Sequence, residues 1–279
     1  RLALFSAIEG GSAFWSREID ERGAPAVLDR LRNNAYDSIK HAAIVHKVQE
    51  FESAAALQSI EKSGAHFIIP GDALWPLRVD ELESPPIGLI VKGNLEILSN
   101  SSLAIVGTRN PTPYGVRIAG DFAAGFVDRE WDIVSGGAYG IDSAAHRGAL
   151  VAEGRTIAVI ASGIDTPYPS GNSRLFDEIC ENGAIITEVV PGVPALPHRF
   201  LTRNRIIAAL SQSTLVVEAA FRSGSLRTAR DAAQLLRPVM AIPGPINSPS
   251  SEGCHRLIGE RAAELVTSVA DACELISAL

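Results

Sequence analysis

Five short segments of this sequence combine glycine, hydroxyl and basic side chains in a way that suits the binding of phosphate. They are GTRNPTPYG (107–115), SGGAYGID (135–142), GIDTPYPSGN (163–172), HRFLTRNRIIAALS (198–211) and RSGSLRTA (222–229). The first two place glycines, hydroxyls and backbone N–H groups at a predicted helix N-terminus, where the helix dipole and unpaired donors favour an anion. Neither matches a known nucleotide fingerprint, since the first lacks the lysine of GxxxxGK[ST] and the second is not GxGxxG. On spacing alone, each of these two loops either binds phosphate or only makes a tight turn.

Basic side chains are concentrated in one region of an otherwise acidic chain. The net charge is -7, which argues against a protein coated in positive charge for indiscriminate DNA binding. Between His198 and Arg237, however, seven arginines face only two acids, Glu218 and Asp231. The arginines in 198–211 come early in a predicted helix, where cations oppose the dipole unless an anion is bound. This is the strongest local indication of a polyanionic ligand, and the alternative is a set of solvated helix faces and ion pairs.

Side chains that could carry out catalysis are poorly supported. No nucleophile has an evident base, and neither a GxSxG elbow nor an HExxH pattern is present. Asp142, Asp165 and Glu218 could act as acid or base, although helix caps and ion pairs are the more ordinary roles for such carboxylates. Tyr168 either stacks on a base or closes its loop as a half-buried tyrosine. We therefore predict no catalytic residue, no metal and no cofactor.

The elements that must position these segments alternate in type after Ser102. Apolar runs (LAIVG, DIVSGG, TIAVIASG, AIITE, TLVVEAA and PVMAIPG) alternate with helical stretches, such as those near 114–130 and from about 141. Continuous apolar strands are typical of a parallel sheet with both faces covered. The sequence thus predicts a doubly wound α/β domain over 101–279, in which ligands bind beyond the carboxyl ends of the strands. We expect a small helical domain over 1–63, and a connector with one or two extension strands over 64–100.

Hydrophobic runs and cysteine spacing indicate the cellular compartment of the protein. No window approaches the roughly 18 apolar residues needed to span a bilayer, and the opening segment is interrupted too early to be a secretory signal. The three cysteines show no ligand or disulfide spacing, so we expect three small buried side chains and a cytoplasmic protein. The sequence begins without methionine, and we expect the native start to lie upstream.

Taken together and in this order, the five segments closely resemble the DprA/Smf family of DNA-processing proteins. The resemblance covers about residues 66 to 279, including the PGD...PP...G stretch, while the first 63 residues weakly resemble that family's helical SAM-like domain. It implies an extended Rossmann-like fold and a non-enzymatic protein that binds single-stranded DNA. It also implies a homodimer that helps to load the RecA recombinase in natural transformation.

The resemblance also assigns the residues that would contact DNA. They are Gly107, Thr108, Arg109, Thr112, Ser135, Gly136, Gly137, Asp142, Arg199, Arg203, Asn204, Arg205, Ser223, Gly224, Ser225 and Thr228. Tyr168 and Asn172 are added because the proline-framed loop 163–172 presents an aromatic ring and an amide. The four arginines would neutralise backbone phosphates, the loops would fix register, and Tyr168 would stack on a base without reading its identity.

An enzyme of similar fold is the rival interpretation. Lonely-guy phosphoribohydrolases carry a PGGxGTxxE pattern, and the equivalent stretch here reads SGSLRTARD, with Asp231 at the position of the catalytic glutamate. The missing glycine, the shorter acid and the arginine-lined site make nucleotide hydrolysis the minority prediction. A third interpretation is a nucleotide sensor or adaptor, which would bind a mononucleotide as well as it binds longer DNA.

Overall fold

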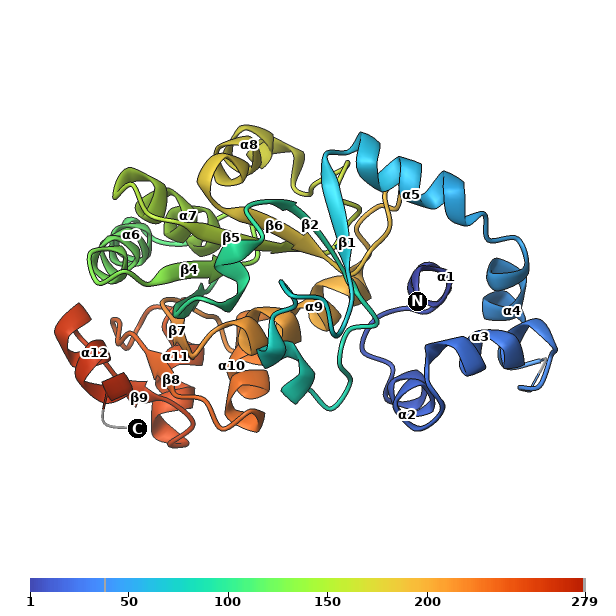
Figure 1. Ribbon diagram of the computed structural model, residues 1–279. Helices are drawn as coiled ribbons and strands as arrows, with labels where there is room; N and C mark the ends of the chain where they lie inside the picture. Colours follow the sequence, from blue (N-terminus) through green and yellow to red (C-terminus); the bar gives the residue numbers. More distant parts are fainter. Residues whose placement is uncertain (38, 278–279) are drawn as a thin grey trace.

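The computed structural model describes residues 1–37 and 39–277. Within those residues the centre is a nine-stranded sheet in the order β1-β2-β6-β5-β4-β3-β7-β8-β9 (Figure 1). The strands are β1 (Ala65–Ile68), β2 (Leu89–Gly93), β3 (Ser102–Val106), β4 (Asp132–Ser135), β5 (Thr156–Ile160), β6 (Ala184–Thr187), β7 (Ser213–Val216), β8 (Val239–Ala241) and β9 (Glu264–Leu265). Neighbours from β6 to β9 in that order pair in parallel, and β2 pairs antiparallel with both β1 and β6. The predicted α/β fold with a mostly parallel sheet is confirmed.

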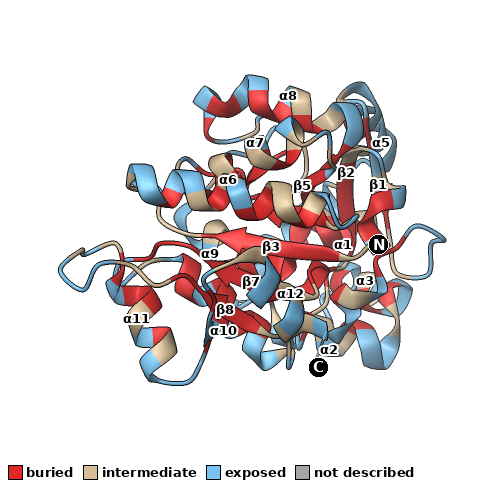
Figure 2. Ribbon diagram, turned by 90° about the vertical axis from the view of Figure 1, so that its left-hand side faces the viewer, coloured by how far each residue is buried: buried red, intermediate tan, exposed pale blue. Residues whose placement is uncertain are grey.

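The inner strands are buried along their whole length. Every residue of β3, β4, β5, β6 and β7 is buried, because helices cover both faces of the sheet (Figure 2). Successive side chains of a strand point to opposite faces. Leu103 and Ile105 accordingly join one hydrophobic cluster, and Ala104 and Val106 join the other.

Two groups of helices form the outer layers. One face is covered by α6 (Pro113–Val127), α7 (Ile141–Val151), α8 (Ser173–Asn182) and α12 (Val269–Ser277). The other face is covered by α9 (Pro197–Leu210), α10 (Ser225–Gln234) and α11 (Glu252–Gly259), together with the short helices η1 (Leu77–Glu81) and η2 (Glu96–Ser99). This arrangement is doubly wound, as the alternation of strands and helices predicts.

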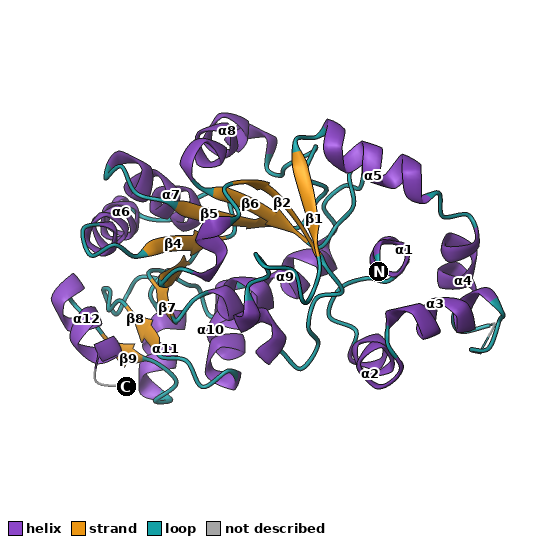
Figure 3. Ribbon diagram, in the orientation of Figure 1, coloured by secondary structure: helices purple, strands orange, loops and turns teal. Residues whose placement is uncertain are grey.

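In residues 1–37 and 39–62, the regular elements are all helices (Figure 3). They are α1 (Leu2–Ala7), α2 (Ala13–Arg22), α3 (Ala24–Arg32), α4 (Ala42–Gln49) and α5 (Ser53–Lys62). Their core, which includes Leu4, Trp15 and Leu31, is separate from the clusters around the sheet. Phe5 of α1 and Ile60 of α5 are exceptions, because both belong to a cluster around the sheet. The ring centroid of Phe5 lies 5.0 Å from that of Phe67 on β1. The predicted division of the chain into domains at 63 and 100 stays a prediction.

The order of the strands reverses at β3. Along the chain, β4, β5 and β6 are added on one side of β3, and β7, β8 and β9 are added on the other. Ligands of open α/β sheets bind at such a switch point, where the loops after two adjacent strands diverge. A ligand-binding site is therefore expected between the loops that follow β3 and β7.

Two expectations about the whole chain can be compared with the structure. The prediction of three buried cysteines is wrong for two of them: Cys254 is buried, but Cys180 and Cys273 lie on partly exposed helix faces. All three are free thiols. In the residues that the structure describes, no helix combines the length and apolar character that crossing a membrane requires.

Candidate nucleic-acid interface

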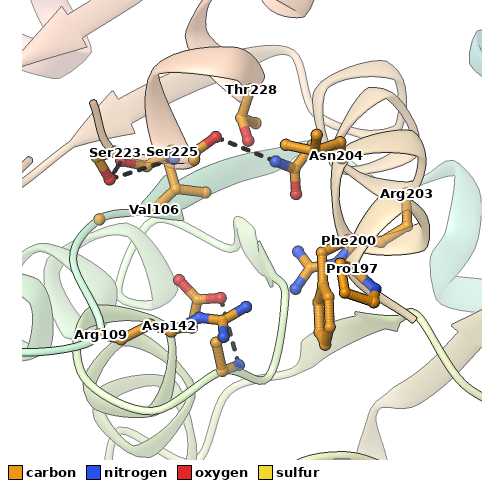
Figure 4. A pocket seen from close by; sticks show the side chains of 14 residues that line it. Val106, Arg109, Asp142, Pro197, Phe200, Arg203, Asn204, Ser223, Ser225 and Thr228 are labelled. Atoms are coloured by element: carbon orange, nitrogen blue, oxygen red, sulfur yellow. Dashed lines mark hydrogen bonds between the residues drawn. The ribbon is translucent and has the colours of Figure 1, made fainter. Parts of the chain in front are cut away.

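A cleft opens at the switch point, between the loops after β3 and β7 and the first half of α9 (Figure 4). Its volume is about 480 Å³. It is lined by Val106, Gly107, Arg109, Ala138, Asp142, Pro197, Phe200, Leu201, Arg203, Asn204, Ser223, Gly224, Ser225 and Thr228. Half of the residues predicted from the sequence are in this lining, and they come from four separate segments of the chain.

Two arginines supply the positive charge of the cleft. Arg203 is buried, and its Nη2 donates a 2.8 Å hydrogen bond to the carbonyl oxygen of Gly136. Burial lowers the pKa of Arg203 to about 10, so the side chain is still a cation at neutral pH. The guanidinium carbon of Arg109 lies 4.7 Å from the ring centroid of Phe200, a cation–π arrangement that holds the side chain over the cleft.

Asp142 is the acid in the lining. It is buried, and its Oδ2 accepts a 3.3 Å hydrogen bond from the backbone N–H of Ala138. Burial raises the pKa of Asp142, and the nearby charge of Arg203 opposes that shift. The two cations outweigh this one buried carboxylate, so the cleft favours an anionic ligand.

Hydroxyl and amide groups line the wall opposite Arg109. Ser223 and Ser225 lie with their Oγ atoms 2.7 Å apart, directly before and at the start of α10. Asn204 donates from Nδ2 to the carbonyl oxygen of Gly224 at 3.1 Å. No heavy atom lies within 4 Å of the position that a Cβ would take on Gly224, so the backbone there is open to a ligand. The positive end of the α10 dipole faces this wall.

The first predicted phosphate loop is occupied by a carboxylate of the protein itself. Glu218, which follows β7, is buried and accepts from the backbone N–H of Thr112 at 2.9 Å and from its Oγ1 at 2.6 Å. Thr112 also caps α6 by accepting from the N–H of Gly115. Thr108 is tied down by backbone hydrogen bonds to Glu218 and Ile141. Of this loop, only Gly107 and Arg109 reach the cleft, because Glu218 takes the place of the anion at the start of α6.

The second loop mainly supports the cleft from behind. Ser135 is buried and donates to the carbonyl oxygen of Ile105 at 2.6 Å. Gly137 has a φ of 66°, and a Cβ there would lie 2.5 Å from the ring of Phe176. Asn172 is buried and donates to the carbonyl oxygen of Gly137 at 2.9 Å. These residues fix the loop that carries Gly136 and Asp142, but they do not line the cleft.

Helix α9 divides its predicted arginines between two faces. Arg203 and Asn204 face the cleft together with Phe200. Arg205 instead donates twice from Nη2 to the carboxylate of Glu188, at 2.6 and 2.8 Å, and Arg199 pairs with Glu9. Arg203 and Arg205 lie in the middle of the helix rather than in its first turn, so the dipole argument from the sequence applies only to Arg199.

Aromatic rings gather at the rim of the cleft. Tyr168 is half exposed and meets Phe200 edge to face, with ring centroids 5.7 Å apart. Tyr139 is also half exposed, and it lines a small crevice together with Arg109, Tyr168 and Phe200. Phe200 and Tyr139 are additions that the sequence reasoning did not make. Phe200 lies three residues before Arg203, so helical periodicity could have placed it on the same face.

The acid that a hydrolase of similar fold would use lies outside the cleft lining. Asp231, at the position of the rival enzymes' catalytic glutamate, is buried and accepts a 2.7 Å hydrogen bond from Arg227 rather than lining the cleft. Burial is the main cause that raises the pKa of Asp231. Across residues 1–37 and 39–277 no cluster of three or more His, Cys, Asp or Glu could hold a metal ion.

Comparison with known proteins gives one consistent answer. Residues 66–277 match the family model described as DNA recombination-mediator protein A. The putative DNA processing protein DprA of Mycobacterium tuberculosis is 43% identical over 242 residues, which cover 82% of this chain and 62% of the relative. The DNA processing protein DprA of Streptococcus pneumoniae is 40% identical over 230 residues, which cover 82% of this chain and 80% of the relative.

Two solved structures extend this likeness to three dimensions. The X-ray structure of DNA processing protein A from Streptococcus pneumoniae superposes with a TM-score of 0.86 at 34% identity, covering 98% of this chain and 95% of that one. DNA processing protein A from Helicobacter pylori, described for its single-stranded DNA binding mode, superposes with a TM-score of 0.69 at 29% identity. That match covers 77% of this chain and 96% of the other.

Proposed function

This chain belongs to the DNA recombination-mediator protein A family, and on that premise we propose that it is a non-enzymatic protein that binds single-stranded DNA in the cleft at the switch point. The chain spans 62% of the length of the Mycobacterium tuberculosis relative, so the activity of the whole protein is part of the proposal. The single-stranded DNA binding mode described for the Helicobacter pylori protein is the comparison that supports this ligand.

One structural observation carries the proposal. Arg109 and Arg203 reach the same cleft from segments that are far apart in the sequence, and the start of α10 with Ser223 and Ser225 forms the opposite wall. Arginine, hydroxyl groups and a helix N-terminus are the groups that typically contact phosphates. Exposed aromatic rings at the rim suit unpaired bases, because every base offers a face on which to stack. An unpaired strand satisfies both requirements at once.

The absence of catalysis is also proposed. The cleft lining holds Asp142 as its acid, and that carboxylate is buried beside Arg203 with the N–H of Ala138 as its hydrogen-bond donor. Asp231, which a nucleotide hydrolase would use, is buried beneath Arg227. Asp231 lies outside the cleft lining, and Asp142, which is part of it, lies beside the cation Arg203. We therefore propose that neither acts as a general acid or base.

Partners and setting follow from the family. We propose that the protein forms a homodimer, helps to load the RecA recombinase onto DNA taken up in natural transformation, and acts in the cytoplasm. The relatives named DNA processing protein support the role in DNA processing. The three free thiols are compatible with a reducing compartment.

The first test is fluorescence anisotropy with a labelled dT oligonucleotide of a few tens of bases, at two salt concentrations, beside a matching duplex. We expect tight binding that prefers the single strand and weakens as salt rises, because phosphate contacts release counterions. Absence of binding at low salt would contradict the proposal. Turnover of AMP or NAD by the purified protein would support the hydrolase instead, and binding of a mononucleotide that longer DNA does not improve would support a nucleotide sensor.

A further inference from the structure

The loop between α1 and α2 packs against α9, beside Thr202 and Arg205. Gly10 and Gly11 make this contact possible. A Cβ on Gly10 would lie 2.8 Å from a carboxylate oxygen of Glu188, and a Cβ on Gly11 would lie 2.9 Å from Cγ2 of Thr202. Gly11 also has a φ of 75°, a backbone conformation that residues other than glycine rarely adopt. The N-terminal helices therefore touch the helix that carries Arg203.

This loop places the carboxylate of Glu9 on Arg199. The Nε of Arg199 donates to Oε2 of Glu9 at 2.9 Å, and the Nη2 donates to Oε1 at 2.6 Å. The Nη1 donates to the carbonyl oxygen of Pro194 at 2.8 Å. The hydrogen bond with Arg199 lowers the pKa of Glu9, so the pair is ionic at neutral pH. All three nitrogens of the guanidinium are thus engaged, and two of them hold one carboxylate in a fork.

The ion pair lies next to the proposed DNA site. Arg199 precedes Arg203 by one turn of α9, and the two arginines line one narrow crevice together with Glu9. Arg203 also lines the cleft. The guanidinium of Arg199 can bind a phosphate in the same two-point geometry in which it binds the carboxylate of Glu9.

We propose that Glu9 is an intramolecular competitor of phosphate, so that the loop between α1 and α2 sets the affinity of the cleft for DNA. The inference rests on the proposed function, and it adds a residue of the N-terminal helices to the site. The side chain of Glu9 is 52% exposed, whereas that of Arg199 is 12% exposed. The acid can therefore rotate into water while the arginine stays in position. Any partner that draws the loop off α9 would expose one more cation to the DNA strand.

Glu9→Gln tests this by keeping the shape of the side chain and removing its charge. The side chain of Glu9 is half exposed and glutamine can still accept a hydrogen bond from Arg199, so we expect the variant to fold, which circular dichroism checks. We expect its affinity for a dT oligonucleotide to rise about 3- to 10-fold, with a salt dependence steeper by about 0.7 in logarithmic units, as one added phosphate contact on a single strand requires. Glu52→Gln is the matched control, since it makes the same change of charge at an exposed position before α5 and should leave affinity unchanged.

The double variant Glu9→Gln/Arg199→Ala separates competition for Arg199 from a general change of charge. If removing the charge of Glu9 acts by releasing Arg199, the affinity of the double variant for the oligonucleotide should equal that of Arg199→Ala alone, because no guanidinium is left to be released. A gain that persists without Arg199 would overturn the proposal. So would unchanged or weaker binding by Glu9→Gln, which would mean that the pair merely positions α9.

Retention on heparin–agarose provides a readout that does not depend on DNA. Glu9→Gln should elute at higher salt than the wild type, and the double variant should elute with Arg199→Ala. If the wild type failed to bind single-stranded DNA while this Arg199-dependent shift remained, the proposed function would be wrong and the competition would stand. If the shift were absent, the competition itself would be wrong.

Discussion

Arg203 and Gly136 touch so closely that no side chain fits between them. The Nη2 of Arg203 donates a 2.8 Å hydrogen bond to the carbonyl oxygen of Gly136, and a Cβ on Gly136 would overlap the guanidinium. The glycine of the loop after β4 thus decides where the buried cation of the cleft can lie. The position of this charge depends on two segments that meet only in the folded protein.

Gly136→Ala should therefore weaken DNA binding by displacing Arg203. We expect the affinity for a dT oligonucleotide to fall about 10-fold, as the loss of one or two phosphate contacts implies. Anisotropy titration measures the change, and circular dichroism checks the fold. Gly120→Ala, in the middle of α6, is the control: a Cβ there meets nothing within 4 Å, and the change should stabilise the helix by about 1 kcal/mol without affecting affinity. Wild-type affinity in a folded Gly136→Ala variant would show that Arg203 does not contact DNA.

Arg109→Ala should weaken binding to all DNA sequences alike. Arg109 is exposed at the rim of the cleft, so its removal deletes a cation without opening a core. We expect the slope of log affinity against log salt concentration to become shallower by about 0.7, the value for one phosphate contact on a single strand. The comparison variant is Arg129→Ala, which removes the same charge just beyond the far end of α6, away from the carboxyl edge of the sheet. An equal effect of the two substitutions would contradict a local contact.

Glu188→Gln should destabilise the protein through Arg205. Both side chains of this ion pair are about 10% exposed, and Nε and Nη1 of Arg205 are buried without a hydrogen-bond partner. Burial raises the pKa of Glu188, and the charge of Arg205 opposes that shift. Removing one partner of a buried pair leaves an uncompensated charge and costs about 3–5 kcal/mol. Urea unfolding measures the loss of stability. The control is Glu178→Gln, which breaks an exposed ion pair with Arg174 and should cost less than about 1 kcal/mol. Similar costs for the two variants would refute the role of burial.

His146 should make stability fall in mild acid. The ring is buried with Nδ1 2.7 Å from Oγ1 of Thr156, and burial lowers its pKa to about 3 from an ordinary value of 6.5. Below pH 6.5 His146 is protonated in the unfolded chain but stays neutral in the folded protein. The free energy of unfolding therefore decreases as the pH falls through 6.5. Between pH 7 and pH 5 the loss from this group should be about 2 kcal/mol.

His146→Gln isolates that contribution, since glutamine has no charge to gain. Urea unfolding of each protein at both pH values gives two differences, and carboxylates contribute equally to both. We expect the wild type to lose about 2 kcal/mol more than the variant over this interval. Equal losses would mean that His146 is protonated in the folded state.

Local pattern predicted the elements and the general place of the site. Buried parallel strands are continuous in apolar residues, so β3 to β8 could be read from short runs, and the loops after them follow from the direction of a parallel sheet. Arg109 and Ser223 reach the cleft for that reason, whereas Arg203 reaches it from the middle of α9. Phe200 could have been added from its spacing to Arg203.

The contacts that distant carboxylates make with these loops and arginines could not be predicted from the spacing of residues in the sequence. Glu9 and Arg199 are 190 positions apart, and Glu218 lies 106 positions from Thr112. A basic side chain in a promising segment is available to a ligand only if no distant carboxylate reaches it first. That competition is decided by packing of segments remote in sequence, which local periodicity does not encode.

The reversal of strand order at β3 has a consequence for biosynthesis. One wall of the cleft follows β3, which ends at Val106, and the other follows β7, which begins at Ser213. Domains fold as units while the ribosome delivers the chain from the N-terminus. A nascent chain that has released β3 to β6 still lacks the strand that must pair beside β3 and carry the second wall. The cleft can therefore form only after β7 and the start of α10 have been synthesised, and a chain truncated before β7 would lack the second wall.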